Sequence, residues 1–176
     1  AQILNYLGQK PIHHKIKAAV AVSTPIDLKS SVDKIERGFS RVYLNRFMKR
    51  LKTKMLVKAN EFPELLDKEQ ISEIRNFEEL INRFLVPAHD FKNLKDFYLR
   101  ASPITYFDYL RTPVLVLNAM DDPIIGDLGF PIEHAKNSQH LFLETPKYGG
   151  HCGFLLAKSN YTFSEVRALE FFKEMV

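Results

Sequence analysis

Cysteine is nearly absent from this sequence, which has 176 residues and a single cysteine, Cys152. A lone cysteine cannot form a disulfide within the chain. Long hydrophobic runs are also missing, since none approaches the roughly 20 apolar residues that a transmembrane helix needs. No stretch at the start has the pattern of a secretory signal. Together these absences predict a protein of the reducing cytoplasm.

Acidic residues are missing from one segment, residues 41–58. The whole chain has 25 basic and 21 acidic residues, and its formal charge is +4. Without the segment, 18 basic residues face 21 acidic ones, so the basic character belongs to the segment alone. No nucleic-acid-binding motif accompanies it, which disfavours a nucleic acid as partner. Its basic residues are Arg41, Arg46, Lys49, Arg50, Lys52, Lys54 and Lys58.

Hydrophobic residues make up 45% of the chain and charged residues 26%, which is ordinary for one globular domain. Three nearly continuous apolar runs, residues 16–27, 112–120 and 140–146, are typical of strands buried on both faces of a parallel sheet. Helical patterns cover the start of the chain, where Gly8 is expected to end the helix, and also residues near 132–135 and 163–176. The order predicts an α/β fold, part of a doubly wound sheet with about three parallel strands.

A helical insertion, at about residues 28–101, interrupts the strands. Residues 41–58 have apolar side chains at helical spacing opposite the basic ones. A second helix is predicted over 67–87, with Asp67 as its N-cap, Gln70 in the capping-box position and Pro87 at its end. A short helix follows near 94–101. The basic helix has two open interpretations: a solvated outer face of a lid, or a surface that contacts anionic lipid.

Polar residues follow two of the predicted strands. Asp121 and Asp122 come after the second strand, and His151 comes after the third strand through Gly149 and Gly150. In open α/β sheets, functional groups gather at the carboxyl ends of strands. An acid that orients a histidine, which then accepts a proton from a nucleophile, is the arrangement of a catalytic triad. The alternative for His151 is a turn histidine that only binds the backbone.

The segments "LRTPVLVLNAMDDPII" and "NSQHLFLETPKYGGHCGFL" resemble the C-terminal half of the α/β-hydrolase superfamily, more narrowly its YheT-like branch of esterases and lipases. The opening "ILNYLG" and the segment "FYLRASPITYF" are similar to that branch as well. The resemblance implies an α/β-hydrolase sheet with a helical cap. It also implies His151 as general base and Asp122, directly before a proline, as the orienting acid. Asp121 is the second choice for the acid and would otherwise brace the turn.

The family's chain order is Ser, Asp, His, with the serine on a G-x-S-x-G turn. Aligning "AQILNYLG" with the family places this serine upstream of Ala1, so we expect the chain to be the C-terminal part of a serine hydrolase. Two nucleophiles within the chain are disfavoured. Ser40, in "GFSRV", has Val42 where the turn needs glycine, and Cys152 adjoins His151, whose side chain diverges from its own.

The expected reaction is the cleavage of carboxylic esters, lipid-like or with a medium-length acyl chain, by a parent enzyme that includes the serine. The fragment alone is expected to be inactive. The competing hypothesis is a non-catalytic hydrolase-fold fragment or interaction module. No cofactor is expected. No metal is expected either, because the remaining histidines lack ligand spacing and Glu133-His134 has no second ligand one turn on.

Overall fold

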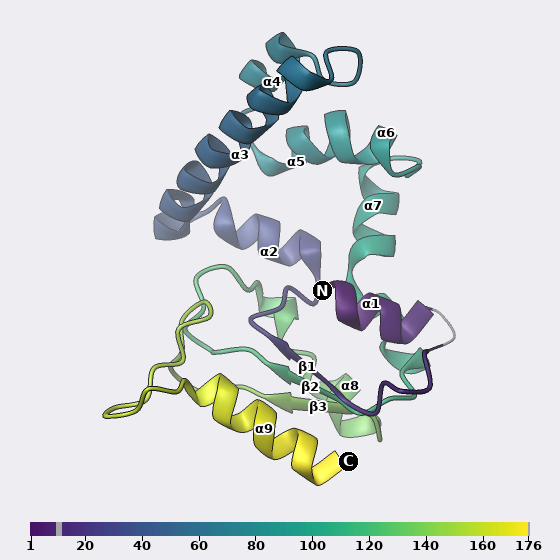
Figure 1. Ribbon diagram of the computed structural model, residues 1–176, viewed down its shortest axis with the longest axis vertical. Coiled ribbons are helices and arrows are strands. Elements are labelled where there is room, and N and C mark those ends of the chain that lie inside the picture. The colour runs from purple at the N-terminus through teal and green to yellow at the C-terminus, as the bar shows by residue number, and fades with distance from the viewer. Residues whose placement is uncertain (10–11, 176) are drawn as a thin grey trace. The chain divides into compact units, whose positions relative to one another are not determined.

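The computed structural model describes residues 1–9 and 12–175. They form two compact units, an α/β unit (Ala1–Lys34 with Tyr98–Val176) and a helical unit (Ile35–Phe97). Figure 1 shows the sheet and its helices in the first unit and only helices in the second. Within the described residues, no helix is both long enough and apolar enough to cross a membrane.

Within the described residues the sheet has three parallel strands, as the sequence predicted, and their order in the sheet is β1-β2-β3. They are β1 (Ala19–Val22), β2 (Val114–Leu117) and β3 (Leu141–Glu144). The four residues of β2 are all buried, which confirms the prediction of burial on both faces for this central strand. The same prediction is wrong for β1, which alternates buried and half-buried residues, and for β3, where only Leu141 is buried. Both flank β2, so their side chains are less fully covered.

Helices cover both faces of the sheet (Figure 1). On one face α1 (Gln2–Gln9) and the 3-10 turns η3 (Pro103–Tyr109) bury a cluster that includes Leu4, Phe107 and Val116. The helix α8 (Ile132–Asn137) adds Ala135 to the same cluster. On the other face lies α9 (Phe163–Met175), whose Phe171 ring meets the Phe142 ring edge-on, with centroids 5.4 Å apart.

Gly8 does not end the first helix as predicted, because α1 continues to Gln9. A Cβ atom at Gly8 would lie 2.5 Å from the Cβ of Tyr106 in η3. The glycine therefore allows two helical segments to approach closely. From the sequence alone, a glycine with this role cannot be told from one that ends a helix.

A capping box starts α9. The Thr162 hydroxyl accepts a hydrogen bond from the Glu165 amide at 3.2 Å, and the Glu165 carboxylate accepts one from the Thr162 amide at 2.7 Å. The Thr162 amide and, at 2.9 Å, the Thr162 hydroxyl both donate to the Glu165 carboxylate, and these bonds, the backbone one foremost, lower the pKa of Glu165. The pair satisfies amide donors that a helix start leaves free.

The helical unit contains α3 (Arg41–Glu61), which agrees with the helix predicted over 41–58. Before α3 lie the helix α2 (Leu28–Ile35) and the 3-10 turn η1 (Gly38–Ser40). Of α2, only its last residue, Ile35, belongs to the helical unit. After α3 come α4 (Lys68–Glu73), α5 (Phe77–Leu80), the π-turn η2 (Ile81–Leu85) and α6 (Val86–Ala88). The helix α7 (Leu94–Ala101), predicted at these residues, leads back to the sheet.

The single helix predicted over 67–87 is wrong, because the chain leaves helical geometry at Ile74. Asn76 restarts it as the N-cap of α5, with its side chain accepting a hydrogen bond from the Glu79 amide at 2.8 Å. Asp67 is the N-cap of α4, as predicted. Gln70 donates to the Asp67 carboxylate at 3.3 Å. Pro87 lies inside α6 and does not end it.

Candidate active site

The carboxyl ends of β2 and β3 place two loops side by side. Leu117 and Glu144, the last residues of the two strands, are partners in the register. The pairing continues beyond the strands, since the Met120 amide donates to the Pro146 carbonyl at 2.9 Å. The loop that follows β2 carries Asp121 and Asp122, and the loop that follows β3 carries His151. Both loops therefore leave the same edge of the sheet.

Asp122 and His151 are in direct contact. The His151 Nδ1 atom lies 2.9 Å from Asp122 Oδ2. Because a carboxylate can only accept, Nδ1 donates this bond, and in the neutral imidazole Nε2 then carries the lone pair. The Asp122 side chain is fully buried, while the His151 side chain is one-third exposed. The arrangement holds the imidazole in one tautomer and leaves its other nitrogen able to accept a proton.

The second oxygen of Asp122 is used by its own loop. Asp122 Oδ1 accepts hydrogen bonds from the amides of Ile124 at 2.8 Å and Ile125 at 3.3 Å. These two donors fix the carboxylate plane, so that Oδ2 is aimed at the histidine. Backbone donors also offset the cost of burying a charged carboxylate.

Asp121 makes a different contact. Its Oδ1 atom accepts a hydrogen bond from the Gly150 amide at 2.8 Å, and the residue is exposed. The carboxylate thus holds the backbone just before His151 and leaves the ring to Asp122. The adjacent acids have separate tasks: one binds the imidazole and the other binds the turn that carries it.

The two glycines of the Gly-Gly turn are in different surroundings. A Cβ atom at Gly149 would lie 2.7 Å from the Phe154 ring and 2.9 Å from the Ala119 Cβ atom. Gly150 has open space around it but a φ of +55°, which side chains disfavour. The Gly149 carbonyl then accepts from the Gly153 amide at 3.2 Å and the Phe154 amide at 2.9 Å. The loop closes on itself around His151.

Two residues of this edge did not emerge from the sequence. Ser23 directly follows β1, and its hydroxyl accepts a hydrogen bond from the Cys152 amide at 3.0 Å. Asn118 directly follows β2, and its buried side chain binds both the amide and the carbonyl of Thr24, at 2.8 and 3.0 Å, and the Gly129 carbonyl at 2.9 Å. Both follow strands, which is the signal that pointed to Asp122 and His151.

The two disfavoured nucleophiles lie in different surroundings. Ser40 ends η1 in the helical unit and takes the N-cap position of α3, where its side chain makes no capping hydrogen bond. Cys152 is exposed and has a left-handed φ of 65°. It contacts Ser23 through its amide rather than its thiol.

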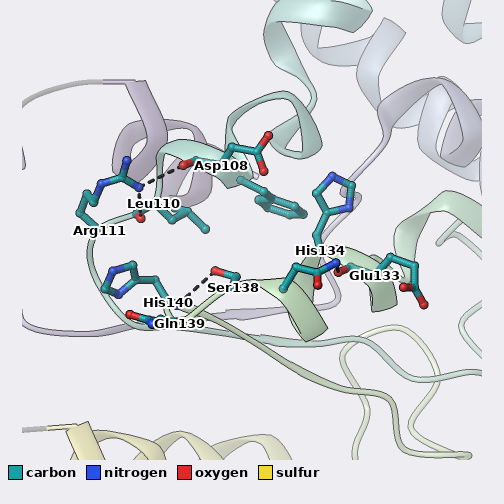
Figure 2. Close-up of a pocket in the computed structure, with 10 residues that line it drawn as sticks. Asp108, Leu110, Arg111, Glu133, His134, Ser138, Gln139 and His140 are labelled. Atoms are coloured by element: carbon teal, nitrogen blue, oxygen red, sulfur yellow. Dashed lines mark hydrogen bonds between the residues drawn. The ribbon is translucent and has the colours of Figure 1, made fainter.

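A separate hollow of about 470 Å³ lies at the opposite end of the strands (Figure 2). Arg111 and His140, which line it, precede β2 and β3. The Arg111 guanidinium donates to the carbonyls of Asp108 and Leu110, at 3.0 and 2.8 Å. The His134 ring packs edge-on against Phe107. Among residues 1–9 and 12–175, no group of three or more His, Cys, Asp or Glu side chains could hold a metal ion.

Comparison with known proteins finds relatives in yeast, mouse and Escherichia coli. The monoacylglycerol lipase of Saccharomyces cerevisiae is 31% identical over 163 residues, which cover 88% of this chain and 36% of that protein. The phospholipase ABHD3 of mouse is 30% identical over 154 residues (87% and 38%). The YheT protein of Escherichia coli is 29% identical over 145 residues (80% and 42%). The chain thus spans about two-fifths of the length of these relatives. No family model and no solved structure matches it.

Proposed function

The chain belongs to the abhydrolase-domain proteins of the α/β-hydrolase superfamily, and from this premise we propose that it supplies the acid and the base of a serine hydrolase that cleaves carboxylic esters. The observation that carries the proposal is the hydrogen bond between His151 Nδ1 and the buried Asp122 carboxylate. Esterase and lipase relatives support hydrolysis as the general activity. The proposed nucleophile is a serine upstream of Ala1, outside this chain.

In this mechanism His151 Nε2 accepts the proton of the serine hydroxyl while the serine oxygen bonds to the ester carbonyl carbon. Asp122 stabilises the imidazolium that forms and keeps Nδ1 protonated. The imidazolium then gives its proton to the alcohol oxygen as the carbon–oxygen bond breaks, which leaves an acyl-enzyme. Water, activated by the same nitrogen, cleaves that intermediate and releases the carboxylic acid.

The proposed substrates are lipid-like or medium-chain acyl esters. The names of two relatives, a monoacylglycerol lipase and a phospholipase, support this class. We assign the helical unit (Ile35–Phe97) as the cap of the hydrolase domain, because it is inserted between β1 and β2 and folds as a compact unit of its own. We propose that apolar side chains of this cap select the acyl chain.

Peripheral contact with a membrane is the second part of the proposal, and the surface of α3 supports it. Arg46, Arg50 and Lys54 are exposed on this helix, and so are Val42 and Tyr43. Basic side chains attract anionic lipid headgroups, and neighbouring apolar side chains enter the interface. The test is sedimentation of the full-length protein with phosphatidylcholine vesicles that contain or lack phosphatidylserine. Replacing the three basic residues with Gln should abolish binding to anionic vesicles, and unchanged binding would contradict this assignment.

Ester hydrolysis is tested with the full-length protein that contains this chain. It should hydrolyse p-nitrophenyl esters of medium acyl length and should react with a fluorophosphonate at one serine. His151→Gln should remove turnover and slow labelling while the protein stays folded. Turnover by His151→Gln at the wild-type rate would overturn the role of this histidine.

The competing function is a non-catalytic module that keeps part of the hydrolase fold. Its motivation is that "GFSRV", the nearest pattern to the serine turn, lacks the final glycine. A full-length protein without ester turnover and without fluorophosphonate labelling would favour this module over the enzyme.

A further inference from the structure

Ser23 occupies a strained position at the end of β1. Its φ is +47°, in the left-handed region, and its side chain is buried, with 5% of the residue exposed. A Cβ atom in this region lies too close to the following carbonyl oxygen, so the conformation is strained. Glycine would avoid that strain. Strain of this kind at a strand end points to a task for the side chain.

The surrounding structure holds the backbone of Ser23 in place. The Ser23 amide donates to the Leu117 carbonyl at 2.9 Å, which extends the β1–β2 ladder by one residue. The next residue, Thr24, is bound at its amide and its carbonyl by the buried side chain of Asn118. The hydroxyl of Ser23 therefore projects from a fixed point.

That hydroxyl accepts the amide proton of Cys152, which belongs to the peptide bond directly after His151. On the other side of the histidine, the Asp121 carboxylate accepts the amide proton of Gly150. Asp122 binds the ring itself. His151 is thus held at three places: by its ring, by the backbone before it and by the backbone after it.

We propose that Ser23 is a positioning residue for His151, which fixes the peptide after the histidine so that the ring stays in line with Asp122. This inference rests on the proposed hydrolase function for its kinetic consequence. Its structural consequence, the alignment of the ring, can be measured without any reaction. Ser23 connects β1 to a site that is otherwise built from the ends of β2 and β3.

The experiment uses two substitutions in the full-length protein. Ser23→Ala removes the hydroxyl and keeps the backbone strain, while Ser23→Gly removes the hydroxyl and relieves the strain. The control is Ser102→Ala. Ser102 is a buried serine of the same unit whose hydroxyl accepts the Leu28 amide at 3.0 Å. Melting curves, ester kinetics and the imidazole ¹⁵N shifts of His151 are measured for each protein.

We expect both Ser23 variants to lose about 10- to 100-fold in kcat with KM unchanged, since a small misplacement of a catalytic group has this effect. In both, the ¹⁵N shifts of neutral His151 should move from the Nδ1–H tautomer toward a mixture. Ser23→Gly should melt no lower than Ser23→Ala, and Ser102→Ala should keep both kcat and the tautomer.

A purely structural serine gives the opposite pattern, with activity following stability, so that Ser23→Gly is nearly as active as the wild type. Wild-type kcat and a pure Nδ1–H tautomer in Ser23→Gly would overturn the inference. If the wild-type protein hydrolyses no ester, the proposed function fails, and the ¹⁵N shifts alone decide the role of Ser23.

Discussion

The Asp121 carboxylate accepts a hydrogen bond from the Gly150 amide at 2.8 Å, across a sequence separation of 29 residues. Asp122, the next residue, spans the same separation to reach the His151 ring. The pair of acids is therefore matched to the pair Gly150-His151, with one acid for the backbone and one for the side chain. This match explains why two adjacent acids follow β2, and it separates their expected contributions to stability and activity.

Asp122→Asn should reduce kcat for ester hydrolysis by about 10⁴, because an amide can stabilise the wrong tautomer of His151. Its Oδ1 can still accept from Ile124 and Ile125, so the melting temperature should change little. Asp121→Ala should show the reverse balance, with about 1 kcal/mol of stability lost and a far smaller change in kcat. Kinetics and thermal melts of both variants check this, and an inactive Asp121→Ala with an active Asp122→Asn would reverse the assignment.

Gly149 and Gly150 should respond differently to substitution. Gly149→Ala places a methyl group 2.7 Å from the Phe154 ring, and it should cost about 1–3 kcal/mol by overpacking. Gly150→Asn should be nearly neutral, because asparagine tolerates a positive φ and open space surrounds this residue. Chemical denaturation of the two variants makes the comparison. If Gly149→Ala loses as little stability as Gly150→Asn, the packing around Gly149 relaxes to accept the methyl group.

Much of this edge of the sheet could be predicted from the sequence. Parallel strands bring their carboxyl ends together, so polar residues after β2 and β3 had to meet. Asp122 and His151 were selected for this reason. The helices α3, α7 and α9 followed from their apolar periodicity, which is a local property that survives in the folded protein.

Other features depend on distant contacts that no local pattern reveals. Ser23 and Cys152 are separated by 129 residues, and Asn118 and Thr24 by 94. In the sequence, Ser23 and Thr24 only interrupt the apolar run 16–27, and nothing local indicates these contacts. The helix break at Ile74 was missed because the apolar period continues through it and Ile74 itself is buried. There, the capping side chain of Asn76 outweighs periodicity.

Cys152→Ala should leave kcat for ester hydrolysis within about twofold of the wild type, because the contact of Cys152 with Ser23 is made by the backbone amide. The variant keeps that amide, and its small side chain replaces one that is exposed. Iodoacetamide should modify the wild-type thiol without abolishing fluorophosphonate labelling. Complete loss of turnover in Cys152→Ala would instead favour a cysteine nucleophile.

Glu165 should make the start of α9 sensitive to acid. Hydrogen bonds from Thr162 lower its pKa in the folded protein. A carboxyl group with a lower pKa in the folded than in the unfolded protein stabilises the fold at any pH above its unfolded pKa. This stabilisation is lost as the pH falls through the folded pKa. Glu165→Gln should therefore lower the melting temperature near neutral pH more than at low pH. An equal loss at both values would exclude a role for the charge.

Asn118→Ala should be among the more destabilising changes at this edge. Its side chain makes three hydrogen bonds and is completely buried, so the variant leaves the Thr24 amide, the Thr24 carbonyl and the Gly129 carbonyl without these partners. We expect a loss of about 3–5 kcal/mol, since each buried polar group left unpaired costs about 1–3 kcal/mol. The matched control is Asn137→Ala, which removes an exposed amide bonded to the Glu133 carbonyl and should change stability by less than about 0.5 kcal/mol. Urea denaturation measures the stability of both variants. Comparable losses of stability would show that the hydrogen bonds of Asn118 contribute no more for being buried.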